Sequence, residues 1–137
     1  MILVDTNALV ALIDYSDQLN KQATADFPRL QKRKLYLISP VIAEAVHLLP
    51  FKQDRQRLVA FLDEFQFEKC PIHETDELWQ ETFQWLRRYS EHSPDWADAL
   101  LAVLSGREKR FRVWTYDSEF KTIWRRPDGS RIPLAVP

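Results

Sequence analysis

The feature that most constrains the fold is the opening run Met1-Ile2-Leu3-Val4-Asp5-Thr6-Asn7, in which apolar residues lead directly into a carboxylate. Ile2 to Val4 show no alternation of apolar and polar residues, so they predict a strand buried on both faces, as in the middle of a parallel sheet. Asp5 then lies at the carboxyl end of that strand, where open α/β sheets bind their ligands. It is either a metal ligand or nucleophile held by a rigid strand, or simply the N-cap of a helix that starts at Asn7.

Short apolar segments alternate with helical segments along the rest of the chain, which is typical of a mainly parallel sheet covered by helices on both faces. Two Ser-Pro pairs, at 39–40 and 93–94, predict helix starts, because a hydroxyl N-cap precedes a proline at the first helical position. Gly106 is the expected C-cap of the second of these helices. The expected strands cover residues 2–5, 35–38, 67–70, 112–116 and an edge strand at 131–134. The expected helices cover residues 7–13, a segment from the turn at 14–17 to about 32, and 41–49, 52–65, 75–89, 93–105 and 118–123.

The helix over 75–89 carries apolar residues at helical spacing, and we expect one side of it to face the core. That side comprises Leu78, Trp79, Thr82, Phe83 and Leu86. We expect the five tryptophans of the chain to lie mostly in the core.

The composition fits a single domain over residues 1–137, since 45% of the residues are hydrophobic and a chain of this length can bury a sizeable core. Cys70 is the only cysteine, which excludes an intrachain disulfide and a cysteine-based zinc site, and we expect it to be a small buried side chain at a strand end. The sequence shows no signal-peptide pattern and no apolar run of the roughly 18 residues that a membrane span needs. We therefore expect a soluble cytoplasmic protein.

Charge is distributed unevenly along the chain. The formal net charge is −1, but residues 105–137 contain eight Lys or Arg and four acids, a net of +4, which leaves −5 on residues 1–104. A basic end on an acidic body could hold a phosphate backbone beside an acidic site. An ordinary solvated surface would explain the same counts.

Carboxylates follow several of the expected strands. Asp5 ends the first strand, Glu44 lies in the first turns of the helix after the second, and Asp117 follows the fourth. Asp95 and Asp98 are three residues apart and so share one face of a helix start. Because strand ends and the helices that follow them meet at one edge of a parallel sheet, we expect these acids to converge there.

Glu44 and Asp98 interrupt helices that are otherwise apolar around them. An unpaired buried charge is costly, so each must be liganded, paired with an arginine, or part of a solvent-facing stripe. Converging carboxylates repel one another, and an all-oxygen donor set suits Mg²⁺ or Mn²⁺. Such ions activate water and neutralise a scissile phosphate, so the implied chemistry is metal-dependent phosphodiester hydrolysis.

The motifs around these acids resemble those of PIN-domain ribonucleases, especially the small VapC-like toxins. The first family motif is matched by Val4-Asp5-Thr6-Asn7, the second by Ser39-Pro40-Val41-Ile42-Ala43-Glu44, the third by Asp98-Ala99-Leu100-Leu101-Ala102, and the fourth by Thr115-Tyr116-Asp117-Ser118-Glu119-Phe120. The resemblance covers almost the whole chain. It implies a PIN-like α/β/α sandwich with a mainly parallel central sheet of about five short strands.

The same resemblance implies an activity, a cofactor and partners. It implies a Mg²⁺- or Mn²⁺-dependent endoribonuclease acting on single-stranded RNA, the toxin of a toxin–antitoxin pair, which forms a homodimer and binds a cognate antitoxin. The residues that it assigns to catalysis and metal binding are Asp5, Glu44, Asp98 and Asp117. The residues that it assigns auxiliary polar roles are Asn7, Asp95 and Thr115, and Thr6 shapes the turn after the first strand.

Other functions remain open at this point. A non-catalytic RNA-binding or antitoxin-binding module could use the same fold. A phosphatase with an aspartyl intermediate at Asp5 would need a second Asp at position 7, where the chain has Asn7. The two glycines cannot build a phosphate-binding loop for a nucleotide cofactor.

Trp124, beside Arg125 and Arg126, either stacks on a base or packs in the core. We expect surface or packing roles for the scattered histidines, His47, His73 and His92.

Overall fold

A computed structural model describes residues 1–137 and contains a sheet of four parallel strands in the order β3-β2-β1-β4. The strands are β1 (Ile2–Val4), β2 (Leu35–Leu37), β3 (Glu68–Lys69) and β4 (Arg112–Trp114). The helices are α1 (Thr6–Ile13), α2 (Asn20–Leu30), α3 (Ser39–Leu48), α4 (Lys52–Glu64), α5 (Asp76–Arg88), α6 (Trp96–Arg107) and α7 (Glu119–Thr122), with a short 3₁₀ helix η1 (Ser90–His92) before α6.

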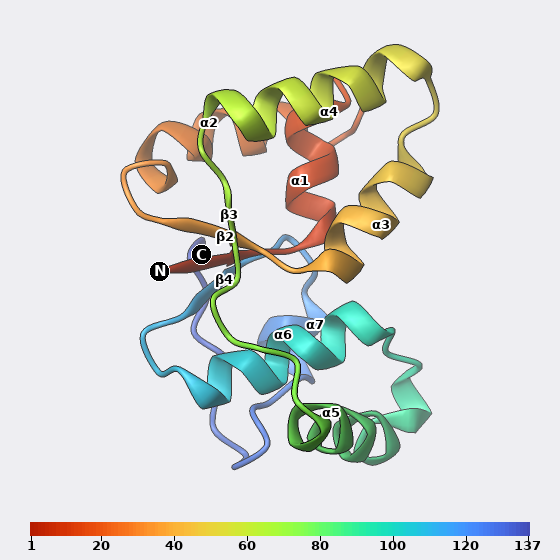
Figure 1. The fold of residues 1–137 in the computed structure, drawn as a ribbon, viewed down its shortest axis with the longest axis vertical. Coiled ribbons are helices and arrows are strands. Elements are labelled where there is room, and N and C mark those ends of the chain that lie inside the picture. The colour runs from red at the N-terminus through yellow and green to blue at the C-terminus, as the bar shows by residue number, and fades with distance from the viewer.

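The sheet lies between two layers of helices, so the expected α/β/α sandwich is confirmed. Figure 1 shows α1 to α4 on one side of the sheet and α5, α6 and α7 on the other. Within each layer the helices pack on one another, α1 against α2, α3 and α4, and α5 against α6. None of the helices has both the length and the apolar character needed to cross a membrane.

Strand β1 is the centre of the sheet, as its sequence predicted. It pairs with β2 on one side and β4 on the other, with Ile2 opposite Leu35 and Arg112. Ile2, Leu3 and Val4 are at most 1% exposed, because helices cover both faces of the strand. A strand held in this way fixes the position of the residue that follows it, Asp5.

The expected fifth strand is reduced to isolated bridges. Leu134 forms a parallel bridge with Val113, and Arg131 forms an antiparallel bridge with Arg125. Val113 donates its N–H to the Pro133 carbonyl at 2.9 Å and accepts from the Ala135 N–H at 2.9 Å. Pro133 has no N–H to donate, so the ladder cannot extend through it, and the sheet has four strands and not about five.

The two Ser-Pro pairs behave differently. Helix α3 begins at Ser39 with proline in its first turn, although its N-cap is Ile38 and not the serine. The prediction at 93–94 is wrong, because Ser93 adopts a left-handed conformation with φ of 52° and α6 begins only at Trp96. Asp95 and Asp98 form a capping box there, in which each side chain accepts from the other's backbone N–H at the start of α6.

Two further details of the helices differ from expectation. Gly106 lies inside α6, which ends at Glu108 as its C-cap. On helix α5 the prediction is confirmed for Leu78 and Thr82, which are buried, and for Leu86, which packs against the core. It is wrong for Trp79 and Phe83, which are exposed, while Trp85 is buried in their place. The buried Thr82 hydroxyl donates to the Leu78 carbonyl at 2.7 Å, which removes the cost of burying it.

The tryptophans divide into two groups. Trp85, Trp114 and Trp124 are at most 2% exposed and belong to the core, as expected. The Trp124 ring packs against Trp85 and Tyr89, with ring centroids 5.2 and 5.5 Å away, so it cannot stack on a base. Trp79, in contrast, is 47% exposed. Cys70 is buried just after β3, as predicted.

Candidate active site

Asp5 is fixed at the carboxyl end of β1 by hydrogen bonds to both carboxylate oxygens. Its Oδ1 accepts from the Thr6 N–H at 2.8 Å, which makes it the N-cap of α1. Its Oδ2 accepts from the Thr115 hydroxyl at 2.7 Å and from the Asn7 amide at 3.1 Å. The capping role and the position at the sheet edge are therefore both realised, and the side chain is only 5% exposed.

Asn7 and Thr115 join the ends of β1 and β4. The Asn7 amide donates to Thr115 Oγ1 at 3.1 Å, and its Oδ1 accepts from the Tyr116 N–H at 2.9 Å. Thr115 Oγ1 also accepts from the Asp117 N–H at 3.0 Å. With one donated and two accepted bonds, this hydroxyl is fully used, and it positions Asp5 and the Asp117 backbone against each other.

Asp95 and Asp98 are held by the capping box at the start of α6. Asp95 Oδ1 accepts from the Asp98 N–H at 2.8 Å, and Asp98 Oδ2 accepts from the Asp95 N–H at 3.1 Å. Asp117 is held in a similar way, because its Oδ1 accepts from the Glu119 N–H at 2.9 Å where α7 begins. Each of these carboxylates therefore has a defined direction set by its own backbone.

The acids at this edge of the sheet influence one another electrostatically. The pKa of Asp5 is raised to about 6, chiefly by burial. Hydrogen bonds from Thr115 and Thr6 oppose this shift, and the charges of Asp95 and Asp117 contribute to it. Burial and then the charge of Asp95 raise the pKa of Asp98 to about 8, with a contribution from Asp5. These residues thus form one group at the edge of the sheet.

Glu44 on α3 belongs to the same group. Burial raises its pKa, and so do the charge and hydrogen bonding of Asp95, while Thr6 acts in the opposite direction. Asp95 therefore influences Asp5, Glu44 and Asp98 alike. We refer to the five residues as the acidic cluster: Asp5, Glu44, Asp95, Asp98 and Asp117.

No side chain forms an ion pair with the acidic cluster, although the charge of His47 on α3 lowers the pKa of Glu44. The six ion pairs of the protein all involve other acids, including Glu81 with Arg107 and Asp128 with Lys109. The alternative in which Glu44 and Asp98 are each paired with an arginine is therefore wrong. Three of the basic residues between 105 and 137 are engaged in ion pairs, and Arg126 is buried.

The donor set suits a hard divalent cation, but the side chains are not arranged around a common point. No three His, Cys, Asp or Glu side chains come close enough to hold a metal ion between them. The reason lies in the local hydrogen bonds, since Asp98 turns to the Asp95 N–H and Asp5 to Thr6 and Thr115. Oxygen donors without a cationic partner are nevertheless the set that Mg²⁺ or Mn²⁺ prefers.

The sequence interpretation gave too small a role to two residues. Asp95 was expected to be auxiliary, but its charge raises the pKa of three of the other four acids, Asp5, Glu44 and Asp98. The signal was available, because the spacing of Asp95 and Asp98 fits a capping box. Thr6 was expected only to shape a turn, yet its buried hydroxyl lies near Glu44 and has no hydrogen-bond partner.

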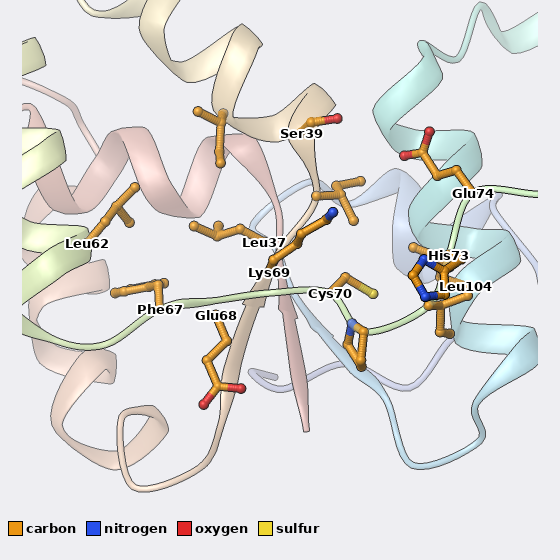
Figure 2. Close-up of a pocket in the computed structure, with 14 residues that line it drawn as sticks. Leu37, Ser39, Leu62, Phe67, Glu68, Lys69, Cys70, His73, Glu74 and Leu104 are labelled. Atoms are coloured by element: carbon orange, nitrogen blue, oxygen red, sulfur yellow. The ribbon is translucent and has the colours of Figure 1, made fainter.

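A separate cavity of about 710 Å³ opens beside the ends of β2 and β3. Figure 2 shows Leu62 and Phe67 at one end of it and His73 and Leu104 at the other, with Lys69 and Cys70 between. No member of the acidic cluster lines this cavity. It is therefore distinct from the acidic site.

A parallel sheet covered on both faces, with acids gathered beyond the ends of β1 and β4 and on α3 and α6, defines a PIN-like class of α/β domain. The family model of the PIN domain matches residues 2–124. The chain therefore belongs to the PIN-domain family, which confirms the resemblance found in its motifs.

A solved structure with a similar fold is the crystal structure of VapC20 from Mycobacterium tuberculosis, described as a toxin that cleaves the sarcin–ricin loop. The two superpose with a TM-score of 0.71 and are 19% identical, over 89% of this chain and 94% of VapC20. At this identity the likeness concerns the fold. Comparison with curated protein sequences finds no match.

Proposed function

We propose that the protein is a divalent-metal-dependent endoribonuclease that hydrolyses phosphodiester bonds of single-stranded RNA. The observation that carries the proposal is the acidic cluster, whose carboxylates lie at the carboxyl edge of the sheet and form no ion pair with a lysine or arginine. Membership of the PIN-domain family and the fold shared with a VapC toxin support it.

In this proposal Asp5, Glu44, Asp98 and Asp117 hold Mg²⁺ or Mn²⁺. The ion, when bound, supplies a more acidic water and neutralises the scissile phosphate. Thr115 and Asn7 fix the direction of the Asp5 carboxylate, so this side chain is already oriented before the substrate binds.

A proton must leave the acidic cluster before it can bind a cation. Burial and the charge of Asp95 raise the pKa of Asp98, which shifts its carboxyl group toward the protonated form in the absence of metal. Cation binding requires the ionised form, so we expect metal uptake to release protons. Asp95 keeps Asp98 aligned through the capping box.

The biological setting is part of the same proposal. VapC20 is a toxin, and we infer that this chain is likewise the toxin of a toxin–antitoxin pair, cytoplasmic and homodimeric, with a cognate antitoxin as partner and RNA as substrate.

The test is cleavage of a labelled single-stranded RNA by the purified protein. We expect cleavage with Mg²⁺ or Mn²⁺, loss of cleavage in EDTA, and loss in the Asp5→Asn and Glu44→Gln variants. Asp63→Asn, an exposed acid on α4, is the matched control and should cleave normally. Cleavage in EDTA, or unchanged cleavage by Asp5→Asn, would reject the proposal.

A second candidate is a non-catalytic RNA-binding or antitoxin-binding module. It is favoured by one observation, namely that the carboxylates are turned to backbone groups and not to a common point. It predicts RNA binding without turnover under any divalent ion, so the same assay distinguishes the two.

A further inference from the structure

Three aromatic rings form a cluster at the surface between α5 and α6. Trp79 and Phe83 lie one turn apart on α5, with ring centroids 6.0 Å apart, and Trp96 begins α6, with its centroid 5.6 Å from Trp79 and 5.2 Å from Phe83. Trp79 is 47% exposed and Phe83 is 37% exposed. We call these three residues the aromatic platform.

The aromatic platform adjoins the acidic cluster along the chain at the start of α6. Trp96 stands between Asp95 and Asp98, the two residues of the capping box that starts α6. Both hydrogen bonds of that box fix the backbone at Trp96, which lies within one helical turn of Asp95 and Asp98. An extended ligand on Trp96 therefore needs to span no more than the first turn of α6 to meet these two acids.

A free cation extends the same surface. Arg87 lies one turn beyond Phe83 on α5, so that Trp79, Phe83 and Arg87 follow one another at i, i+4 and i+8 along the helix. Arg87 is exposed and forms no ion pair, whereas the neighbouring Arg88 donates to the Pro127 carbonyl and lies over the Tyr89 ring.

The exposed area of the platform is small. An aromatic side chain contributes roughly 150–250 Å² when fully buried, so about 40% exposure of two rings leaves on the order of 200 Å². A stable protein–protein interface needs about 800 Å² from each partner. The exposed rings alone therefore match a few stacked flat groups, whereas a folded partner would have to draw most of its interface from residues around the platform.

We propose that Trp79, Phe83 and Trp96 stack unpaired bases of a single-stranded RNA while Arg87 contacts its phosphate backbone, which places a neighbouring phosphodiester at the acidic cluster. Single-stranded nucleic acid is bound by this combination of aromatic faces and cations, and arginine suits phosphate oxygens. This inference rests on the proposed function, because it identifies how the substrate of the acidic site is held.

The test measures binding of a fluorescein-labelled ten-nucleotide oligouridine by anisotropy, in EDTA so that cleavage does not interfere. Trp79→Leu and Phe83→Leu keep apolar volume but remove the flat face, and each should weaken binding about fivefold or more. Trp79→Phe should retain most of the affinity. Arg87→Ala should weaken binding and reduce the slope of log affinity against log salt by about 1. Phe51→Ala, at a ring that is 64% exposed on another part of the surface, is the matched control and should bind normally.

Two results would overturn the inference. One is binding by Trp79→Leu and Phe83→Leu that equals that of the unaltered protein. The other is conversion of a dimer to a monomer by these variants, seen by light scattering, with unchanged RNA affinity per chain, which would make the platform a protein interface. Failure of the proposed function gives a different result. An unaltered protein that binds RNA through the platform but does not cleave it with Mg²⁺ or Mn²⁺ would reject the nuclease activity and retain the binding platform.

Discussion

Replacement of Asp5 by asparagine should change how the stability of the metal-free protein depends on pH. Burial raises the pKa of Asp5 from 3.8 to about 6, a difference that corresponds to about 3 kcal/mol between the charged and neutral forms. Asparagine is as good an N-cap as aspartate and carries no charge. Asp5→Asn therefore removes the titration and keeps the cap of α1.

The direction of this pH dependence follows from the upward shift in the pKa of Asp5. Between pH 3.8 and about 6 the folded protein holds the Asp5 proton more tightly than the unfolded chain does, so the stability from this group is present at low pH and is lost as the pH rises. Between pH 4.5 and pH 8 the loss amounts to about 2 kcal/mol. A second contribution is independent of pH, because asparagine cannot accept from both Thr115 and Asn7, at a cost of about 1 kcal/mol.

The assay is urea unfolding in EDTA at pH 4.5 and pH 8 for the unaltered protein, Asp5→Asn and the control Asp63→Asn. We expect the free energy of unfolding of Asp5→Asn, minus that of the unaltered protein, to be about 2 kcal/mol larger at pH 8 than at pH 4.5, so that the variant is relatively more stable at the higher pH. Asp63→Asn should show no such change. A difference between Asp5→Asn and the unaltered protein that is the same at both pH values would refute the claim that Asp5 is strongly perturbed.

Three further predictions concern the same edge of the sheet and one turn. Mn²⁺ at 100 times its dissociation constant should raise the free energy of unfolding by about 2.7 kcal/mol, and thermal melts should show no such gain for Glu44→Gln if Glu44 is a ligand. Thr115→Val should destabilise the protein by about 1–3 kcal/mol, because the Asp5 carboxylate and the Asp117 N–H lose a partner, and RNA cleavage should fall with it; an unchanged melt and rate would contradict the positioning role. Gly129→Ala should cost about 1 kcal/mol in urea unfolding, because the φ of Gly129 is +87° and strains any L side chain although there is open space for one, so a neutral result would be unexpected.

Much of the sheet edge could be predicted because the relevant signals are local. An unbroken apolar run can only be a strand with both faces covered, which places Asp5 at its carboxyl end. Acids inside the apolar helices α3 and α6 likewise indicated that Glu44 and Asp98 serve something other than solubility. In the structure the pKa of each is raised, first by burial and then by the charge of Asp95.

The features that could not be predicted depend on competition between neighbours. At residues 93–98 a Ser-Pro pair and an Asp–Asp capping box both offered a helix start, and the box prevailed with Ser93 left-handed. In α5 the apolar pattern placed Leu78 and Thr82 correctly but put Trp79 and Phe83 on the buried side in place of Trp85. The Trp85 indole N–H donates to the Arg125 carbonyl at 2.7 Å, a contact distant along the chain that a pattern of apolar residues does not reveal.

The most direct measurement of the central claim is anomalous diffraction from crystals of the protein grown with Mn²⁺. The account predicts an anomalous peak bounded by carboxylate oxygens of the acidic cluster, with Asp98 turned from the Asp95 N–H toward the ion. A well-ordered structure from saturating Mn²⁺ with no peak at this edge of the sheet, or with the ion bound elsewhere, would contradict it.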